Sequence, residues 1–141
     1  MGDDNRELMY QDGVSRIYWN GELRCVEFES SEVSGTRTVD SKQIRETLLK
    51  VLDVIKEKRA RKFLMDATNG TTVPVEDMLW MEKEWLPQGL KTGVKYTAVV
   101  VPKSLASHMV VDKLSDTVDP KAMTKRFFKD RETAREWLAR Q

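Results

Sequence analysis

Segments with helical periodicity alternate with short apolar segments from residue 40 to the end of the chain. The clearest helical pattern covers residues 40–59, where five apolar residues fall on one face of a 3.6-residue repeat: Ile44, Leu48, Val51, Leu52 and Ile55. Residues 62–66 and 96–101 are short and largely apolar, as expected of strands covered on both faces. Strands that alternate with single helices need right-handed crossovers, so this pattern predicts a mostly parallel sheet.

Residues 7–29 follow a different pattern, in which β-favouring residues are separated by turn dipeptides. Asp12-Gly13 and Asn20-Gly21 are pairs that supply the positive φ angles of a two-residue hairpin turn. This segment therefore predicts three short antiparallel strands. The chain as a whole is expected to be an α/β fold in the order βββ-α-β-α-β-α-β-α, with a mixed, mostly parallel sheet and an N-terminal antiparallel meander.

The remaining elements are predicted from helix caps and helix breakers. A second helix opens at Pro74 and ends near Trp85, because Pro87 follows shortly after. Three further elements are a helix over residues 104–117, a strand over residues 124–128 and a last helix capped by Asp130. A length of 141 residues fits a single domain, residues 1–141.

The composition argues against several classes of function. With 24 Lys and Arg against 23 Asp and Glu the formal charge is +1, so no overall field favours nucleic acid. Cys25 is the one cysteine and cannot form an internal disulfide, which favours a cytoplasmic protein. The sequence opens without a secretory signal, and purely apolar runs such as Ala98 to Val101 are too short for membrane insertion.

Local signatures of catalysis are also missing. The sequence has no dinucleotide-binding, P-loop or hydrolase motif, and its single histidine, His108, excludes sites built from two histidines. We therefore expect no cofactor, no metal and no enzymatic activity. The basic segment around Phe127 and Phe128 also contains acidic residues, so we interpret it as a solvated edge strand and not as a nucleic-acid platform.

A candidate binding loop follows the strand that ends at Asp66. Open α/β sheets place ligands beyond the carboxyl ends of their strands. The polar side chains that would line such a crevice are Asp66, Thr68, Asn69, Thr71 and Thr72. The alternative is that Asp66 accepts hydrogen bonds from the amides of its own turn and that the other residues only build the loop.

The helix that opens at Pro74 is rich in large apolar side chains, namely Met78, Trp80, Met81 and Trp85. At 100° per residue, Trp80 lies about 200° from Met78 around the helix, so these side chains cannot all face one way. One interpretation is a surface for a partner protein or a homodimer, because Trp and Met are enriched at interface cores. The other is a helix packed as plain core on two sides.

Two short motifs give the chain a family resemblance. The element order, the segment Phe63-Leu64-Met65-Asp66 and the ending Phe128-x-Asp130-x-x-x-Ala134-x-x-Trp137-Leu138 resemble the SpoIIAA-like, or STAS/SEC14-like, single-domain proteins of bacteria. The resemblance implies a βα sheet with helices largely on one face and a binding or regulatory role, in some members switched by phosphorylation. The Asp-Ser-Ser-Gly type segment expected of the switched members is missing here, which argues against phosphorylation. If phosphorylation occurs, Thr71 or Thr72 near the helix start is the favoured residue.

Together these patterns favour a non-enzymatic, cytoplasmic binding or regulatory module. It would contact a partner protein, or a second copy of itself, through the loop after Asp66 and the helix that contains Trp80. The alternative, which the SEC14 resemblance implies, is a carrier for a small molecule or lipid held in a pocket between the sheet and the helices.

Overall fold

The computed structural model describes residues 6–12, 15–30, 41–68, 75–101 and 123–141. Its strands are β1 (Arg6–Gln11), β2 (Ser15–Asn20), β3 (Cys25–Ser30), β4 (Lys62–Asp66), β5 (Tyr96–Val100) and β6 (Thr124–Phe128). Its helices are α1 (Ser41–Lys58), α2 (Val75–Trp80), the π-helical turn η1 (Met81–Trp85), α3 (Leu86–Lys91) and α5 (Arg131–Ala139). The helix predicted over residues 104–117, with His108, lies outside the described residues.

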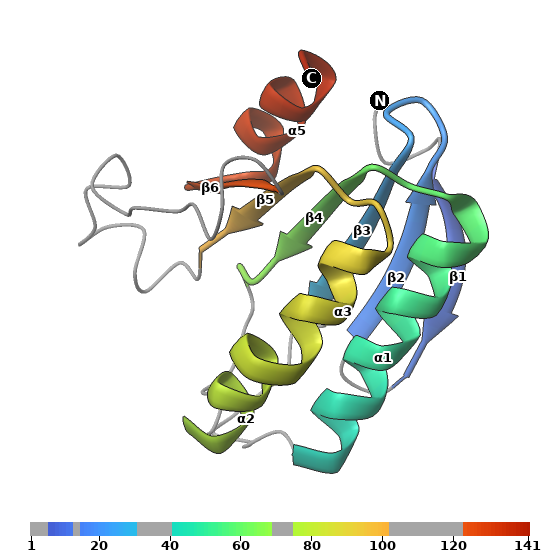
Figure 1. The fold of residues 1–141 in the computed structure, drawn as a ribbon. Helices are drawn as coiled ribbons and strands as arrows, with labels where there is room; N and C mark the ends of the chain where they lie inside the picture. The colour runs from blue at the N-terminus through green and yellow to red at the C-terminus, as the bar shows by residue number, and fades with distance from the viewer. Residues whose placement is uncertain (1–5, 13–14, 31–40, 69–74, 102–122) are drawn as a thin grey trace.

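The six described strands form one sheet in the order β1-β2-β3-β4-β5-β6 (Figure 1). β1, β2 and β3 are antiparallel neighbours, whereas β3, β4, β5 and β6 pair in parallel. The predicted fold class, a mixed and mostly parallel sheet with an antiparallel start, is confirmed.

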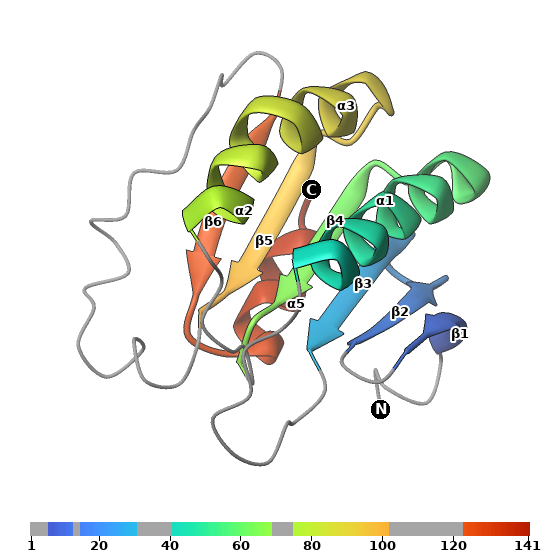
Figure 2. The ribbon, with the colours of Figure 1, turned by 90° about the horizontal axis from the view of Figure 1, so that it is seen from below.

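Helices cover both faces of the sheet, and β4 contributes to both cores. α1, α2 and α3 lie over one face and α5 lies against the other (Figure 2). Phe63 belongs to the core on the α1 side together with Leu52, and the next residue, Leu64, belongs to the core on the α5 side together with Trp137. Successive strand residues point to opposite faces, which explains why the apolar residues of β4 are consecutive.

The second helix is longer than predicted. It does not end near Trp85 but continues through Pro87 to Lys91 as α2, η1 and α3. In the π-helical turn η1 the backbone hydrogen bonds span five residues instead of four. The amide of Leu86 donates to the carbonyl of Met81, five residues earlier. Pro87 then stands in the first turn of α3, where a missing N–H costs little. The π-helical turn thus allows the chain to pass a proline that would otherwise end the helix.

The predicted two-residue turn at Asn20-Gly21 is wrong. Asn20 pairs with Cys25, so four residues connect β2 to β3. The Asn20 side chain accepts a hydrogen bond from the Leu23 amide at 3.2 Å, and Arg24 takes the positive φ of 55°. The side chain of Asn20 therefore stabilises a turn of four residues.

The predicted cap of the last helix agrees with the structure. Asp130 caps α5, where its Oδ1 accepts from the Thr133 amide at 2.7 Å. The two hydrogen bonds from Thr133 lower the pKa of the Asp130 carboxyl. Cys25 is fully buried in β3, and this burial raises the pKa of its thiol well above the ordinary value. The thiol is therefore a packing group with little nucleophilic character.

Candidate functional site

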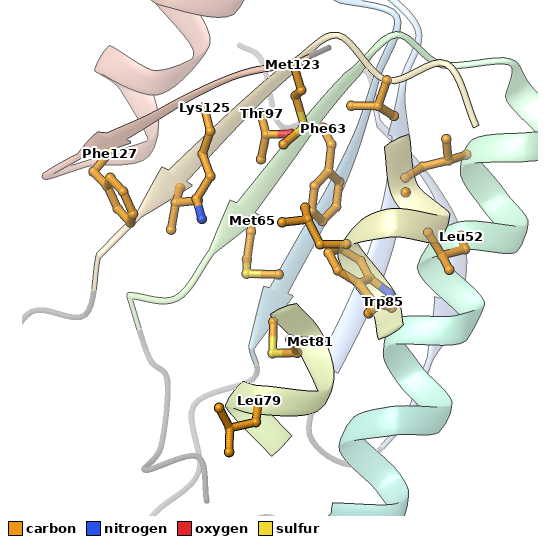
Figure 3. Close-up of a pocket in the computed structure, with 15 residues that line it drawn as sticks. Leu52, Phe63, Met65, Leu79, Met81, Trp85, Thr97, Met123, Lys125 and Phe127 are labelled. Carbon is orange, nitrogen blue, oxygen red and sulfur yellow. The ribbon is translucent and has the colours of Figure 1, made fainter. Parts of the chain in front are cut away.

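An apolar groove lies between β4, β5 and β6 on one side and α1, η1 and α3 on the other (Figure 3). Its volume is about 610 Å³. Most of the side chains that line it are apolar, and those labelled in Figure 3 include Leu52, Phe63, Met65, Leu79, Met81, Trp85, Met123 and Phe127. The groove is therefore suited to an apolar occupant.

The floor of the groove consists of two rows of side chains that cross three parallel strands. In the first row Phe63, Thr97 and Lys125 are register partners. In the second row Met65 pairs with Val99, and Val99 pairs with Phe127. The rows are two residues apart along each strand, so all of these side chains point to the same face. The register between strands, rather than any single segment, creates this surface.

Only two polar side chains are among the described residues that line the groove, Thr97 and Lys125. The Thr97 hydroxyl donates to the sulfur of Met123 at 3.2 Å. The Lys125 ammonium lies 5.3 Å from the centre of the Phe127 ring, which is within the range of a cation–π contact. Lys125 is thus the one charged group of the described lining, and it could meet a single anionic group on a ligand.

Trp85 forms part of the wall of the groove but is a core residue, with 7% of its surface exposed. Its Nε1 donates to the carbonyl oxygen of Leu48 at 2.7 Å, which ties η1 to α1. Its ring packs on Phe63, with centroids 6.0 Å apart. Of the two interpretations left open by the sequence, the position of Trp85 matches the core and does not match an exposed partner surface.

The other bulky residues of this helix lie nearer to solvent. Trp80 is half-buried and has the guanidinium of Arg45 at 5.2 Å from its ring centre. Met81 is half-buried and lines the groove. Leu79, which was not among the predicted site residues, is 46% exposed. The side chain of Met78 lies outside the described part of the structure. This helix therefore contributes both to the core and to the surface.

Asp66 lies on the opposite face of the sheet from the groove, and only 4% of its surface is exposed. One carboxylate oxygen accepts from the amide of Thr68 at 2.9 Å and also from the Thr68 hydroxyl. The other accepts from Nε of Arg131 in α5 at 2.7 Å. Asp66 thus stabilises its own turn and attaches α5 to the end of β4.

This ion pair belongs to a larger cluster under α5. Glu27 is 1% exposed, and its two oxygens accept from Arg135 at 2.6 and 3.0 Å. Arg131 also donates to Glu29 at 2.6 Å. Burial disfavours the charged form of Arg131, but the hydrogen bond and charge of Asp66, with Glu29 adding to them, outweigh it and raise the pKa of the guanidinium.

This cluster was not predicted from the sequence, although β3 contains a signal for it. Glu27 and Glu29 alternate with Val26 and Phe28, so two acidic side chains are placed on one face of an interior strand. Carboxylates in such a position need cationic partners. The partners lie about a hundred residues away in the sequence, and the helix that holds them could not be assigned to this face beforehand.

A model of the SpoIIAA-like family matches residues 31–139, which is most of the 141-residue chain. The chain belongs to the SpoIIAA-like family. No curated protein and no solved structure gives a match. A SpoIIAA-like, STAS-type domain is typical of a binding or regulatory module, and the mixed sheet described above is consistent with this fold.

Part of the loop predicted to bind a ligand in this SpoIIAA-like domain is described. Asp66 and Thr68 are bonded to each other, whereas Asn69, Thr71 and Thr72 lie outside the described residues. Within the described ranges no group of three or more His, Cys, Asp or Glu side chains could hold a metal ion. None of the described helices is both long enough and apolar enough to cross a membrane.

Proposed function

We propose that this SpoIIAA-like domain is a non-enzymatic binding module whose ligand occupies the apolar groove between the sheet and the helices. The observation behind this proposal is the size and chemistry of the groove. Its volume of about 610 Å³ falls within the range of roughly 300–1,000 Å³ that is usual for small-molecule sites. Among the described residues, its lining is apolar apart from Thr97 and Lys125.

The class of ligand follows from the same residues. An apolar chain or ring system would bury its surface against Phe63, Met65 and Phe127, which is the favourable term in such binding. Lys125 can pair with one carboxylate or similar anionic group at an end of the ligand. The Thr97 hydroxyl is already bonded to Met123 and adds little polarity. The proposed ligand is therefore a small amphipathic molecule with one anionic group.

A competing occupant is the protein itself. Residues 102–122 connect β5 to β6 and lie outside the described residues. A right-handed connection between these two parallel strands would cross the same face of the sheet as the groove. The test must therefore show that the groove accepts a second molecule.

The expected result is saturable binding of a fluorescent fatty acid, and a bound small-molecule mass in native mass spectrometry of gently purified protein. Val99→Trp places a large side chain on the groove floor, and we expect it to weaken binding about tenfold, or about 1.4 kcal/mol. Leu8→Trp is the matched control, because Leu8 is 48% exposed on β1, away from the groove. Circular dichroism and thermal denaturation check that both variants are folded.

Lys125→Met tests the anionic end of the ligand. We expect it to lower the affinity for the fatty acid by about two- to fivefold, which corresponds to the loss of an exposed ion pair. The affinity for a fatty alcohol of the same length should not change. Absence of a bound mass in repeated preparations, together with no saturable binding of the probe, would rule out the ligand proposal. That result would favour residues 102–122 as the occupant of the groove.

A second candidate function is contact with a partner protein or a second copy of this chain through α2. The observation that favours it is Leu79, which is 46% exposed beside the half-buried Trp80. Tryptophan is one of the residues enriched at the cores of protein interfaces. The loop after Asp66 stays part of this proposal, as does phosphorylation of Thr71 or Thr72.

Light scattering and pull-down experiments with Leu79→Gln test this surface. If α2 is an interface, the variant should show a lower mass in solution or lose specific partners that the wild type retains. Leu8→Gln is the control, because it removes an equally exposed leucine from β1. A contact through α2 is contradicted if the wild type is monomeric and if wild type and Leu79→Gln retain the same partners.

A further inference from the structure

A second hollow is lined by residues at the opposite end of the strands from Asp66. At this end α1 and α3 finish and β4 and β5 begin (Figure 1). Its volume is about 800 Å³. Five cationic side chains line it, all of them exposed: Lys56, Arg59, Arg61, Lys91 and Lys95. We call this site the basic hollow. It is separate from the apolar groove, whose lining residues it does not share.

None of the described residues that line the basic hollow is acidic. The other described residues that line it are Ala60, Gln88, Thr92 and Gly93. None of the five cations has an ion-pair partner in the part of the chain that the structure describes. The formal charge of the lining is therefore +5, although the protein as a whole carries +1.

Helix dipoles explain part of this charge but not all of it. Lys56 and Lys91 lie in the last turns of α1 and α3, where a cation stabilises the partial negative charge of the helix end. Arg61 and Lys95 stand outside both helices, directly before β4 and β5. Two helix ends supply about one negative charge between them, so a large positive excess remains.

The backbone holds these like charges close together. The carbonyl of Arg61 accepts from the amides of Lys95 at 2.7 Å and Tyr96 at 3.1 Å, so the two cationic positions lie side by side. Arg59 takes a positive φ of 53° just after α1, in a conformation that glycine adopts at lower cost. Like charges at adjacent positions repel each other, and a bound anion would relieve that repulsion.

We infer that the basic hollow binds a compact, soluble anion with several phosphate or carboxylate groups. Its volume is much larger than a single phosphate requires, and five cations could meet several anionic groups at once. A concave site that is lined by side chains from two helix ends and two strand starts fits a compact molecule better than a flat membrane surface. This inference does not depend on the ligand proposed for the groove.

Isothermal titration calorimetry with inorganic tripolyphosphate tests the inference. We expect saturable binding that weakens strongly when the ionic strength rises from about 0.1 M to about 1 M, since the Debye length falls from about 10 to about 3 Å. Lys56→Gln with Lys91→Gln should weaken binding about tenfold. Lys50→Gln with Lys83→Gln removes the same charge from exposed positions outside the hollow, and this control should bind as the wild type does.

Three results would overturn the assignment: no saturable binding, equal weakening in both double variants, or equal affinity for single phosphate and tripolyphosphate. Vesicles of phosphatidylcholine with phosphatidylserine provide the membrane arm. Sedimentation with these vesicles that is lost in Lys56→Gln with Lys91→Gln, together with no saturable binding of tripolyphosphate, would assign the hollow to a membrane surface and contradict a soluble ligand. Binding of the fluorescent fatty acid should be unchanged in Lys56→Gln with Lys91→Gln, which separates this test from that of the groove.

Discussion

Replacement of Glu27 by alanine is expected to lower the free energy of unfolding by about 3–5 kcal/mol, the usual cost of removing one partner of a buried ion pair. Glu27 accepts from Asn20 at 3.0 Å, from Arg6 at 3.2 Å and from Arg135 through both of its oxygens. After its removal, the side-chain amide of Asn20 and the guanidinium groups of Arg6 and Arg135 would lose their bonds to this carboxylate in a largely buried site. The loss is large because water cannot readily replace a group that is 1% exposed.

Urea denaturation followed by circular dichroism measures this loss. Glu57→Ala is the control, because Glu57 is exposed on α1 and its removal should change stability by no more than about 0.5 kcal/mol. Glu27→Gln keeps the shape and removes the charge, so it shows how much of the effect is electrostatic. If Glu27→Ala unfolds at the same urea concentration as Glu57→Ala, the carboxylate does not hold α5 to the sheet as the structure shows.

The elements that were predicted well have local causes. The bounds of β4 and β6 agree with the predicted strands at residues 62–66 and 124–128. In both, the length and the flanking residues of a short segment determine the strand. The cap at Asp130 is equally local, because the carboxylate bonds to the amide three residues later.

The elements that were predicted poorly depend on groups far apart in the sequence. Glu27 and Arg135 are 108 positions apart, and only the packing of α5 on the sheet brings them together. The two-row floor of the groove likewise depends on the register of three strands. Pro87 appeared to be a helix breaker because a proline alone does not indicate that a π-helical turn precedes it.

The helix rich in Trp and Met shows the limit of periodicity. Trp80, Met81 and Trp85 all pack against the core on the α1 side, and the side chain of Met78 lies outside the described residues. The spacing predicted that these four side chains could not all face one way. It could not say that Trp85 faces the core while Leu79 faces solvent, because that depends on where α1 lies. The sequence predicted a pocket between the sheet and the helices only as an alternative, because the residues that line it come from segments far apart in the sequence.

Replacement of Trp85 by alanine is expected to cost about 3–5 kcal/mol of stability, as for other large aromatic residues in a core. The indole fills space between η1 and β4, packs on Phe63 and lines the groove. Its removal would leave a cavity and one unmade hydrogen bond at the carbonyl of Leu48. Trp85→Phe keeps most of the volume and removes the hydrogen bond, so it should cost less, about 0.5–1.5 kcal/mol.

Thermal and urea denaturation of the two variants separate packing from hydrogen bonding. Trp80→Ala is a matched control on the same helix, and we expect a smaller loss of about 1 kcal/mol, since Trp80 is only half-buried. A loss at Trp85 no larger than that at Trp80 would mean that η1 is not packed against α1 and β4. The groove would then lack one of its walls in the wild type as well. In that case neither the wild type nor Trp85→Ala should bind the fatty acid with measurable affinity.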